Sequence, residues 1–97
     1  MMRIVIHPAV HSDVLQIMEY YESVADPELA AEFYRELRSF FDKAGMNPYS
    51  FQIIESNLRR VNLDRFPYHF LYKIADDAVR ILVVRHHHRH PSTGRER

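Results

Sequence analysis

The fold is decided by residues 58–86, which read LRRVNLDRFPYHFLYKIADDAVRILVVRH. Three runs in this stretch are rich in β-branched, aromatic and other apolar residues: Leu58–Leu63, Tyr68–Ile74 and Val79–His86. The breaks between them, Asp64–Pro67 and Ala75–Ala78, contain Asp and Pro residues that favour turns. Short turns join neighbouring strands, so the three runs predict an antiparallel β-meander.

A register for the last two runs follows if Asp76 and Asp77 form a two-residue hairpin loop. The expected cross-strand pairs are Tyr72 with Ile81, Phe70 with Val83, and Tyr68 with Arg85. Leu63 is expected to face Tyr68 across the first turn. Since successive residues of a strand point to opposite faces, this register divides the sheet into two different surfaces.

One surface is apolar and is expected to receive helices. Its expected members are Val61, Leu63, Tyr68, Phe70, Tyr72, Ile74, Val79, Ile81 and Val83. The opposite surface is expected to carry Arg60, Asn62, His69, Lys73, Arg80 and His86 around an aliphatic strip of Leu71, Leu82 and Val84. Such a strip ringed by cations is typical of a groove for an acidic amphipathic segment or a phosphate backbone. The alternative is an open sheet face with cations that reach into solvent.

The N-terminal half has the pattern of a strand followed by two helices. Arg3–Ile6 is a short strand that ends before Pro8. Apolar residues recur at helical spacing from Pro8 to Val24, and again from Pro27 to about Ala44. Asp26 is placed to cap the second helix, and Gly45 to end it. Two helices joined this closely predict an antiparallel hairpin, whose aromatic stripe indicates core rather than a cofactor site.

Together these patterns predict one α+β domain over residues 1–97. An N-terminal strand and an antiparallel two-helix hairpin would pack on the antiparallel meander. Residues 46–57 have no clear pattern and stay unassigned. Residues 91–97 are expected to form a flexible basic tail.

Composition narrows the class of protein. The 97 residues include no Cys, which excludes disulfide scaffolds and thiolate metal sites and fits a cytoplasmic location. The chain shows neither a signal-peptide pattern at Met1–Ile6 nor an apolar run of membrane-spanning length, so no membrane partner is expected. Formal net charge is zero, yet acids predominate over residues 19–36 and bases over residues 80–97. The basic end indicates an anionic partner.

The histidines at the C-terminal end raise the question of a metal site. His86, His87 and His88 are consecutive, so neighbours on a strand point to opposite faces. The tail offers no Cys, and no carboxylate before Glu96, to complete a tetrahedral set. We therefore expect neither a metal site nor a cofactor.

The order of these elements resembles the RelE/ParE toxin superfamily, and in particular its ParE-like plasmid-stabilisation branch. The resemblance covers nearly the whole chain. It rests on Tyr20-Tyr21, on Ala31, Phe33 and Leu37, on Leu58–Arg60, on Arg65–Ile74, and on His86-x-x-Arg89-x-Pro91. It implies the toxin of a type II toxin–antitoxin system, neutralised by a cognate antitoxin whose acidic segment wraps around it.

The resemblance leaves two cellular targets open. ParE-like members bind DNA gyrase and stall it without hydrolytic chemistry, and they depend on the C-terminal region; this reading is favoured here. RelE-like members cut messenger RNA on the ribosome, using basic sheet residues and a C-terminal Tyr or His. In this sequence His69 stands where a sheet Arg is expected, and Thr93 where a Tyr is expected. The candidate residues for a ribonuclease are His69, His86, Arg60 and Arg89, with the histidines as acid and base.

A third hypothesis is a decayed, non-toxic family member that survives only as an antitoxin-binding or DNA-repression module. One set of residues is expected to bind antitoxin or target. They are Arg60, Asn62, His69, Leu71, Lys73, Arg80, Leu82, Val84, His86 and Arg89.

Overall fold

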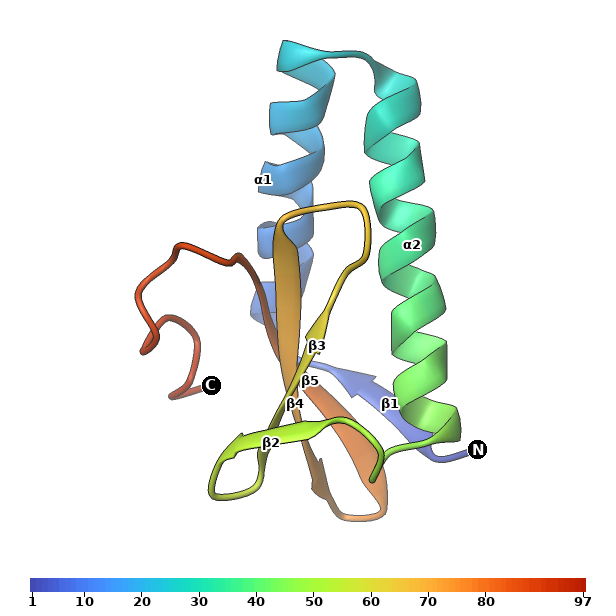
Figure 1. Cartoon of the computed structure of the whole chain (residues 1–97), viewed down its shortest axis with the longest axis vertical. Coiled ribbons are helices and arrows are strands. Elements are labelled where there is room, and N and C mark those ends of the chain that lie inside the picture. Colours follow the sequence, from blue (N-terminus) through green and yellow to red (C-terminus); the bar gives the residue numbers. More distant parts are fainter.

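The computed structural model describes residues 1–97 as two helices on a five-stranded mixed sheet. The strands are β1 (Arg3–Ile6), β2 (Gln52–Glu55), β3 (Leu58–Asn62), β4 (Tyr68–Ala75) and β5 (Ala78–His86). The helices are α1 (Pro8–Val24) and α2 (Pro27–Met46). The sheet order is β1-β5-β4-β3-β2. Figure 1 shows the helices side by side and the C-terminal residues folded back beside β5.

The predicted α+β fold is confirmed, with two additions. β1 pairs with β5 in parallel, which makes the sheet mixed rather than wholly antiparallel. β2, at the opposite edge, lies within the segment that the sequence left unassigned. No helix combines the length and apolar character needed to cross a membrane.

Both helices begin where the sequence predicts. The side chain of Asp26 accepts a 2.8 Å hydrogen bond from the Leu29 N–H, and His7 Nδ1 accepts one of 3.0 Å from the Ala9 N–H. These bonds satisfy N–H groups that the first helical turn leaves without partners. α2 continues past Gly45 to Met46, so the predicted helix end at Gly45 is wrong. Gly45 is instead buried against β1, where the Met2 N–H donates to its carbonyl.

The core lies between the helix hairpin and one face of the sheet. Phe33 is fully buried, with its ring 5.5 Å from the rings of Phe66 and Tyr68. Phe41 contacts Phe70 edge to face at 4.8 Å. Edge-to-face packing of this kind stabilises a core beyond the area that it buries.

A β-bulge changes the predicted register of the last two strands. Tyr72 pairs with Ile81 as expected, but the next pair is Leu71 with Val83, which leaves Leu82 without a partner. The expected pairs Phe70–Val83 and Tyr68–Arg85 are therefore wrong. The observed pairs are Phe70–Val84 and Tyr68–His86. The predicted two-residue loop between β4 and β5 is confirmed, since Asp76 and Asp77 both have positive φ and lie between the paired Ala75 and Ala78.

Because a bulge places two successive residues on one side, it exchanges the faces of the residues beyond it. Val84 joins the core beneath the helices, and the His86 ring lies 5.1 Å from the core residue Tyr68. Val83 instead clusters with Leu71 and Leu82 on the opposite face. The prediction that Val84 and His86 point away from the helices is therefore wrong.

Candidate functional site

The candidate site is the sheet face opposite the helices, together with the C-terminal segment that covers it. Seven predicted members lie on this face, as their cross-strand partners show: Arg60, Asn62, His69, Leu71, Lys73, Arg80 and Leu82. They do not form the open groove that the sequence predicts, since His69 and Leu71 are at most 1% exposed and Leu82 is 4% exposed. Arg89 is exposed on the covering segment.

We name this covering segment, residues 87–97, the C-terminal strap. It begins where the His87 N–H donates to the Pro67 carbonyl at 3.0 Å. Gly94, with φ of +79°, lies so close to Val83 that a Cβ at position 94 would be 2.5 Å from the Val83 Cβ. The strap thus lies against Val83, which clusters with Leu71 and Leu82 in the aliphatic strip. The tail that the sequence suggested would be flexible is held against the sheet in this structure.

Arg85 attaches the middle of the strap to the sheet. Its guanidinium donates to the carbonyls of Pro91 at 2.8 Å and Thr93 at 2.7 Å, and its Nε donates to His69 Nε2 at 2.9 Å. The residue is 6% exposed, and this burial lowers its pKa. A buried guanidinium needs such acceptors to replace water. Arg85 is therefore a structural support for the strap.

Three side chains continue this network from Arg85. His69 Nδ1 lies 2.9 Å from His87 Nδ1, and the planes of the two rings are nearly parallel, with their centroids 5.2 Å apart. Arg60 reaches His87 Nδ1 at 3.3 Å and donates to Asn62 Oδ1 at 2.7 Å. Burial, followed by the charges of Arg60 and Arg85, lowers the pKa of His69 to about 3. His69 is consequently neutral at physiological pH.

The end of the strap is attached to α1. Arg97 forms a bidentate ion pair with Asp13, with its two terminal guanidinium nitrogens 2.6 and 3.2 Å from the two carboxylate oxygens. The Arg97 guanidinium also donates to the Leu82 carbonyl at 3.2 Å. Asp13 also accepts the N–H of Val84, beside the bulge, at 3.1 Å. The hydrogen bond to Asp13 raises the pKa of Arg97. Arg95 forms a further ion pair with Glu55 at 2.5 Å.

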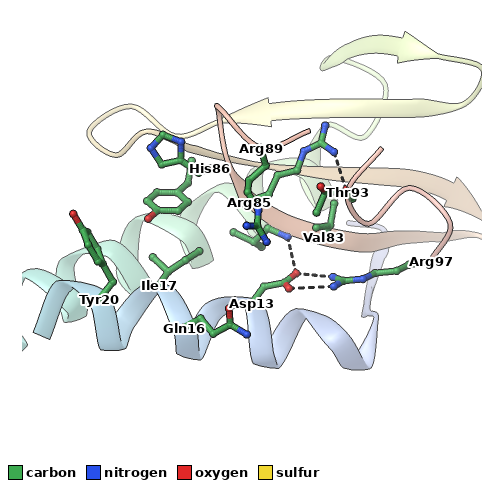
Figure 2. A pocket seen from close by; sticks show the side chains of 12 residues that line it. Asp13, Gln16, Ile17, Tyr20, Val83, Arg85, His86, Arg89, Thr93 and Arg97 are labelled. Carbon is green, nitrogen blue, oxygen red and sulfur yellow. Dashed lines mark hydrogen bonds and ion pairs between the residues drawn. The ribbon is translucent and has the colours of Figure 1, made fainter. Parts of the chain in front are cut away.

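A cleft of about 290 Å³ lies between α1, the end of β5 and the strap. Figure 2 shows Asp13 and Arg97 bonded at one end and His86 at the other, with Arg89 above. Tyr20, which is 54% exposed, and Tyr68 add aromatic surface. Cationic and aromatic groups of this kind suit an anionic partner.

Replacing Asp13 tests how firmly the strap is attached. Asp13→Asn keeps an acceptor for the Val84 N–H but removes the charge opposite Arg97, so we expect a loss of about 1 kcal/mol in the free energy of unfolding. Asp13→Ala removes both contacts, for which we expect about 2–3 kcal/mol. Urea unfolding measures both. The exposed Asp42→Asn is the matched control, and equal losses in all three variants would contradict the attachment.

Sequence reasoning missed four of the residues that build this site. They are Asp13, Arg85, His87 and Arg97. The bulge moved Arg85 to this face, and Asp13 and Arg97 are separated by 84 residues, so no local spacing connects them. The structure contains no group of three or more His, Cys, Asp or Glu side chains arranged to hold a metal ion.

Comparison with solved structures defines the class first. The fold is similar to a chain described as "Chromosomal ParDE TA system from P. aeruginosa", with a TM-score of 0.79 and 17% identity; the match covers 89% of this chain and 96% of that one. The chain therefore shares the fold of that protein over nearly its whole length.

Sequence comparison then gives the family. A family model described as "ParE toxin of type II toxin-antitoxin system, parDE" matches residues 4–91. The chain therefore belongs to the ParE toxin family, whose members pair with an antitoxin. It is also similar to the proteins named Toxin ParE2 of Mycobacterium tuberculosis, strains CDC 1551 / Oshkosh and ATCC 25618 / H37Rv. Each is 24% identical over 90 residues, covering 93% of this chain and 86% of the relative.

Proposed function

We propose that this toxin acts by binding DNA gyrase and stalling it, without acid–base catalysis of its own. The supporting observation is the placement of the two candidate catalytic histidines. Tyr68 pairs with His86 and His69 pairs with Arg85, so His69 and His86 point to opposite faces of the sheet. General acid–base cleavage of RNA requires both groups at one phosphate. These two histidines do not meet that requirement.

His69 is also poorly suited to proton transfer. Both of its ring nitrogens are engaged, Nε2 by Arg85 and Nδ1 by His87, and its side chain is 1% exposed. A general base must reach the proton that it removes. We therefore rank the ribosome-dependent ribonuclease second and assign His69 a structural role.

The surface proposed for the target is the exposed cationic part of the strap. Arg89 is exposed, and no side-chain hydrogen bond or ion pair occupies its guanidinium, so it can bind a carboxylate or phosphate without breaking an existing contact. Arg60, Lys73 and Arg80 are partly exposed on the same side of the sheet and extend the basic surface toward an acidic antitoxin segment. Gyrase and ribosomes are both cytoplasmic, and the proposal places the toxin there.

Induction in growing cells distinguishes the three hypotheses. With the antitoxin absent, we expect growth to stop and gyrase-linked DNA breaks to accumulate, while messenger RNA keeps its normal 5′ ends. New messenger ends inside coding regions would contradict the proposal and support the ribonuclease. Continued growth at a verified protein level would support the non-toxic binding module.

Replacing Arg89 tests the proposed contact surface. We expect Arg89→Ala to weaken binding to purified gyrase on the order of tenfold, since one charge-assisted contact contributes roughly 1.4 kcal/mol. The control is Arg35→Ala on α2, whose side chain is similarly exposed and pairs only with Glu28. Fluorescence anisotropy of the labelled toxin measures both affinities. Unchanged binding by Arg89→Ala would remove the strap from the target interface.

A further inference from the structure

The contact between His69 and His87 requires both rings to be neutral. His69 Nε2 accepts a hydrogen bond from Arg85 Nε, so the single proton of a neutral His69 ring is on Nδ1. His69 Nδ1 then donates to His87 Nδ1 at 2.9 Å, and Arg60 approaches the same acceptor at 3.3 Å. From Arg85 through His69 to His87 the two hydrogen bonds run in one direction, and Arg60 points a second donor at the last acceptor, His87 Nδ1.

An added proton interrupts this arrangement on either ring. On His87 it would occupy Nδ1, where the His69 and Arg60 donors already point. On His69 it would occupy Nε2, opposite the Arg85 N–H. A buried donor that faces another donor loses its hydrogen bond and gains charge repulsion.

The groups around the pair offer no negative charge in compensation. The charged and titratable groups facing it are all basic: Arg60 on β3, Arg85 and His86 on β5, and His88 on the strap. Asn62, beside them, already accepts a hydrogen bond from Arg60. Burial and these neighbours lower the pKa of both histidines. The neutral pair is thus the form that this surrounding structure favours.

The pair lies where the strap begins, and the rest of the strap is held mainly by polar contacts. Arg85 binds two strap carbonyls, Arg95 pairs with Glu55, and Arg97 pairs with Asp13. An apolar contact is made where Gly94 lies against Val83. A segment held in this way can detach without unfolding the core beneath the helices.

We propose that His69 and His87 form a proton-operated lock on the C-terminal strap. With both rings neutral, the strap is closed over the sheet. When the pair takes up a proton, the strap detaches and uncovers the strip of Leu71, Leu82 and Val83, with the Arg60 and Arg85 guanidinium groups beside it.

The lock is tested by titrating the ¹⁵N-labelled protein from pH 8 to pH 3. Imidazole ¹⁵N shifts follow each histidine, and heteronuclear NOEs of the Thr93 and Gly94 amides follow the strap. An anionic apolar dye, anilinonaphthalene sulfonate, reports the uncovered strip. We expect loss of the NOEs and gain of dye fluorescence at the midpoint where the His69–His87 pair is protonated, below pH 6.5. Retention of the NOEs after the pair is protonated, or release that follows the carboxylates of Asp13 and Glu55, would overturn the proposal.

Three variants sharpen the test. His87→Ala removes the pair and is expected to release the strap already at pH 7.5, whereas His11→Ala, at an exposed histidine on α1, is expected to behave as the unmodified chain. Gly94→Val keeps the pair but cannot fit against Val83, so it supplies the fluorescence of the open strap at every pH. A strap that stays ordered in His87→Ala at pH 7.5 would show that the pair does not hold it.

Discussion

Replacing Phe33 by alanine is expected to lower the free energy of unfolding by about 3–5 kcal/mol. The ring is fully buried and touches the rings of Tyr21, Phe66 and Tyr68 at centroid distances of 5.5–6.0 Å. Its removal leaves a cavity where α1, α2 and the end of β4 meet. Since a domain of this size has only about 5–15 kcal/mol of stability, this one change removes a large share of it. The urea midpoint measures the loss.

The adjacent residue supplies a control of the same chemistry. Tyr34 follows Phe33 on α2 but is 40% exposed, and its hydroxyl accepts a hydrogen bond from Arg38. We expect Tyr34→Ala to cost less than about 1 kcal/mol. Similar losses at the two positions would mean that α2 does not present the Phe33 face to the sheet.

Acidification from pH 7 to pH 5 is expected to lower the free energy of unfolding by about 2 kcal/mol through His69 alone. The pKa of His69 is about 3 in the folded chain, against 6.5 in an unfolded one. Between these values the unfolded chain binds more protons, so stability decreases as the pH falls. The contribution of the neutral His69 ring to the free energy of unfolding is fully present above pH 6.5 and is lost progressively down to about pH 3. Urea unfolding at each pH gives the slope.

Two variants separate His69 from the other titrating groups. His69→Gln keeps a donor and an acceptor but does not titrate, so we expect most of the slope between pH 7 and pH 5 to disappear. His88→Gln changes an exposed histidine and is expected to keep the slope. If His69→Gln loses stability on acidification as steeply as the unmodified chain, then His69 is not the buried neutral ring described here.

Most of the fold was predictable from local patterns. The ends of α1 follow from Pro8 and from the turn at Asp26-Pro27, and the hairpin between β4 and β5 follows from Asp76-Asp77. These signals are local because caps and tight turns depend on a few adjacent residues. The parallel pairing of β1 with β5 has no such signal, since it joins residues about 75 positions apart.

The site was predicted only in part, and the β-bulge is the main reason. Ile81, Leu82, Val83 and Val84 are all apolar, so this run contains no alternation from which a shifted register could be detected. An uninterrupted register placed Val84 and His86 on the outer face, although the structure places both on the helix side. Arg60 and Asn62 lie on β3 and His69 lies on β4, whose mutual pairing contains no bulge. Their faces are therefore as the sequence predicted.

The covering of the basic face could not be predicted from its own composition. Leu71 and Leu82 were expected at the bottom of an open groove, but both are buried, and the strap lies against their neighbour Val83. The contacts that hold it depend on three-dimensional proximity: Arg85 binds backbone carbonyls, and Arg97 reaches a carboxylate at the other end of the chain. Sequence alone shows the strap only as a basic tail.

The most direct test of binding without catalysis is a reconstituted gyrase reaction. Purified toxin is added to gyrase, relaxed plasmid and ATP, and supercoiled and cleaved DNA are measured together for the unmodified chain and for a variant with His69→Gln and His86→Gln. We expect supercoiling to stop and cleaved DNA to accumulate with both proteins, after correction for the folded fraction. Gyrase that continues to supercoil with a saturating amount of folded toxin would contradict the proposal.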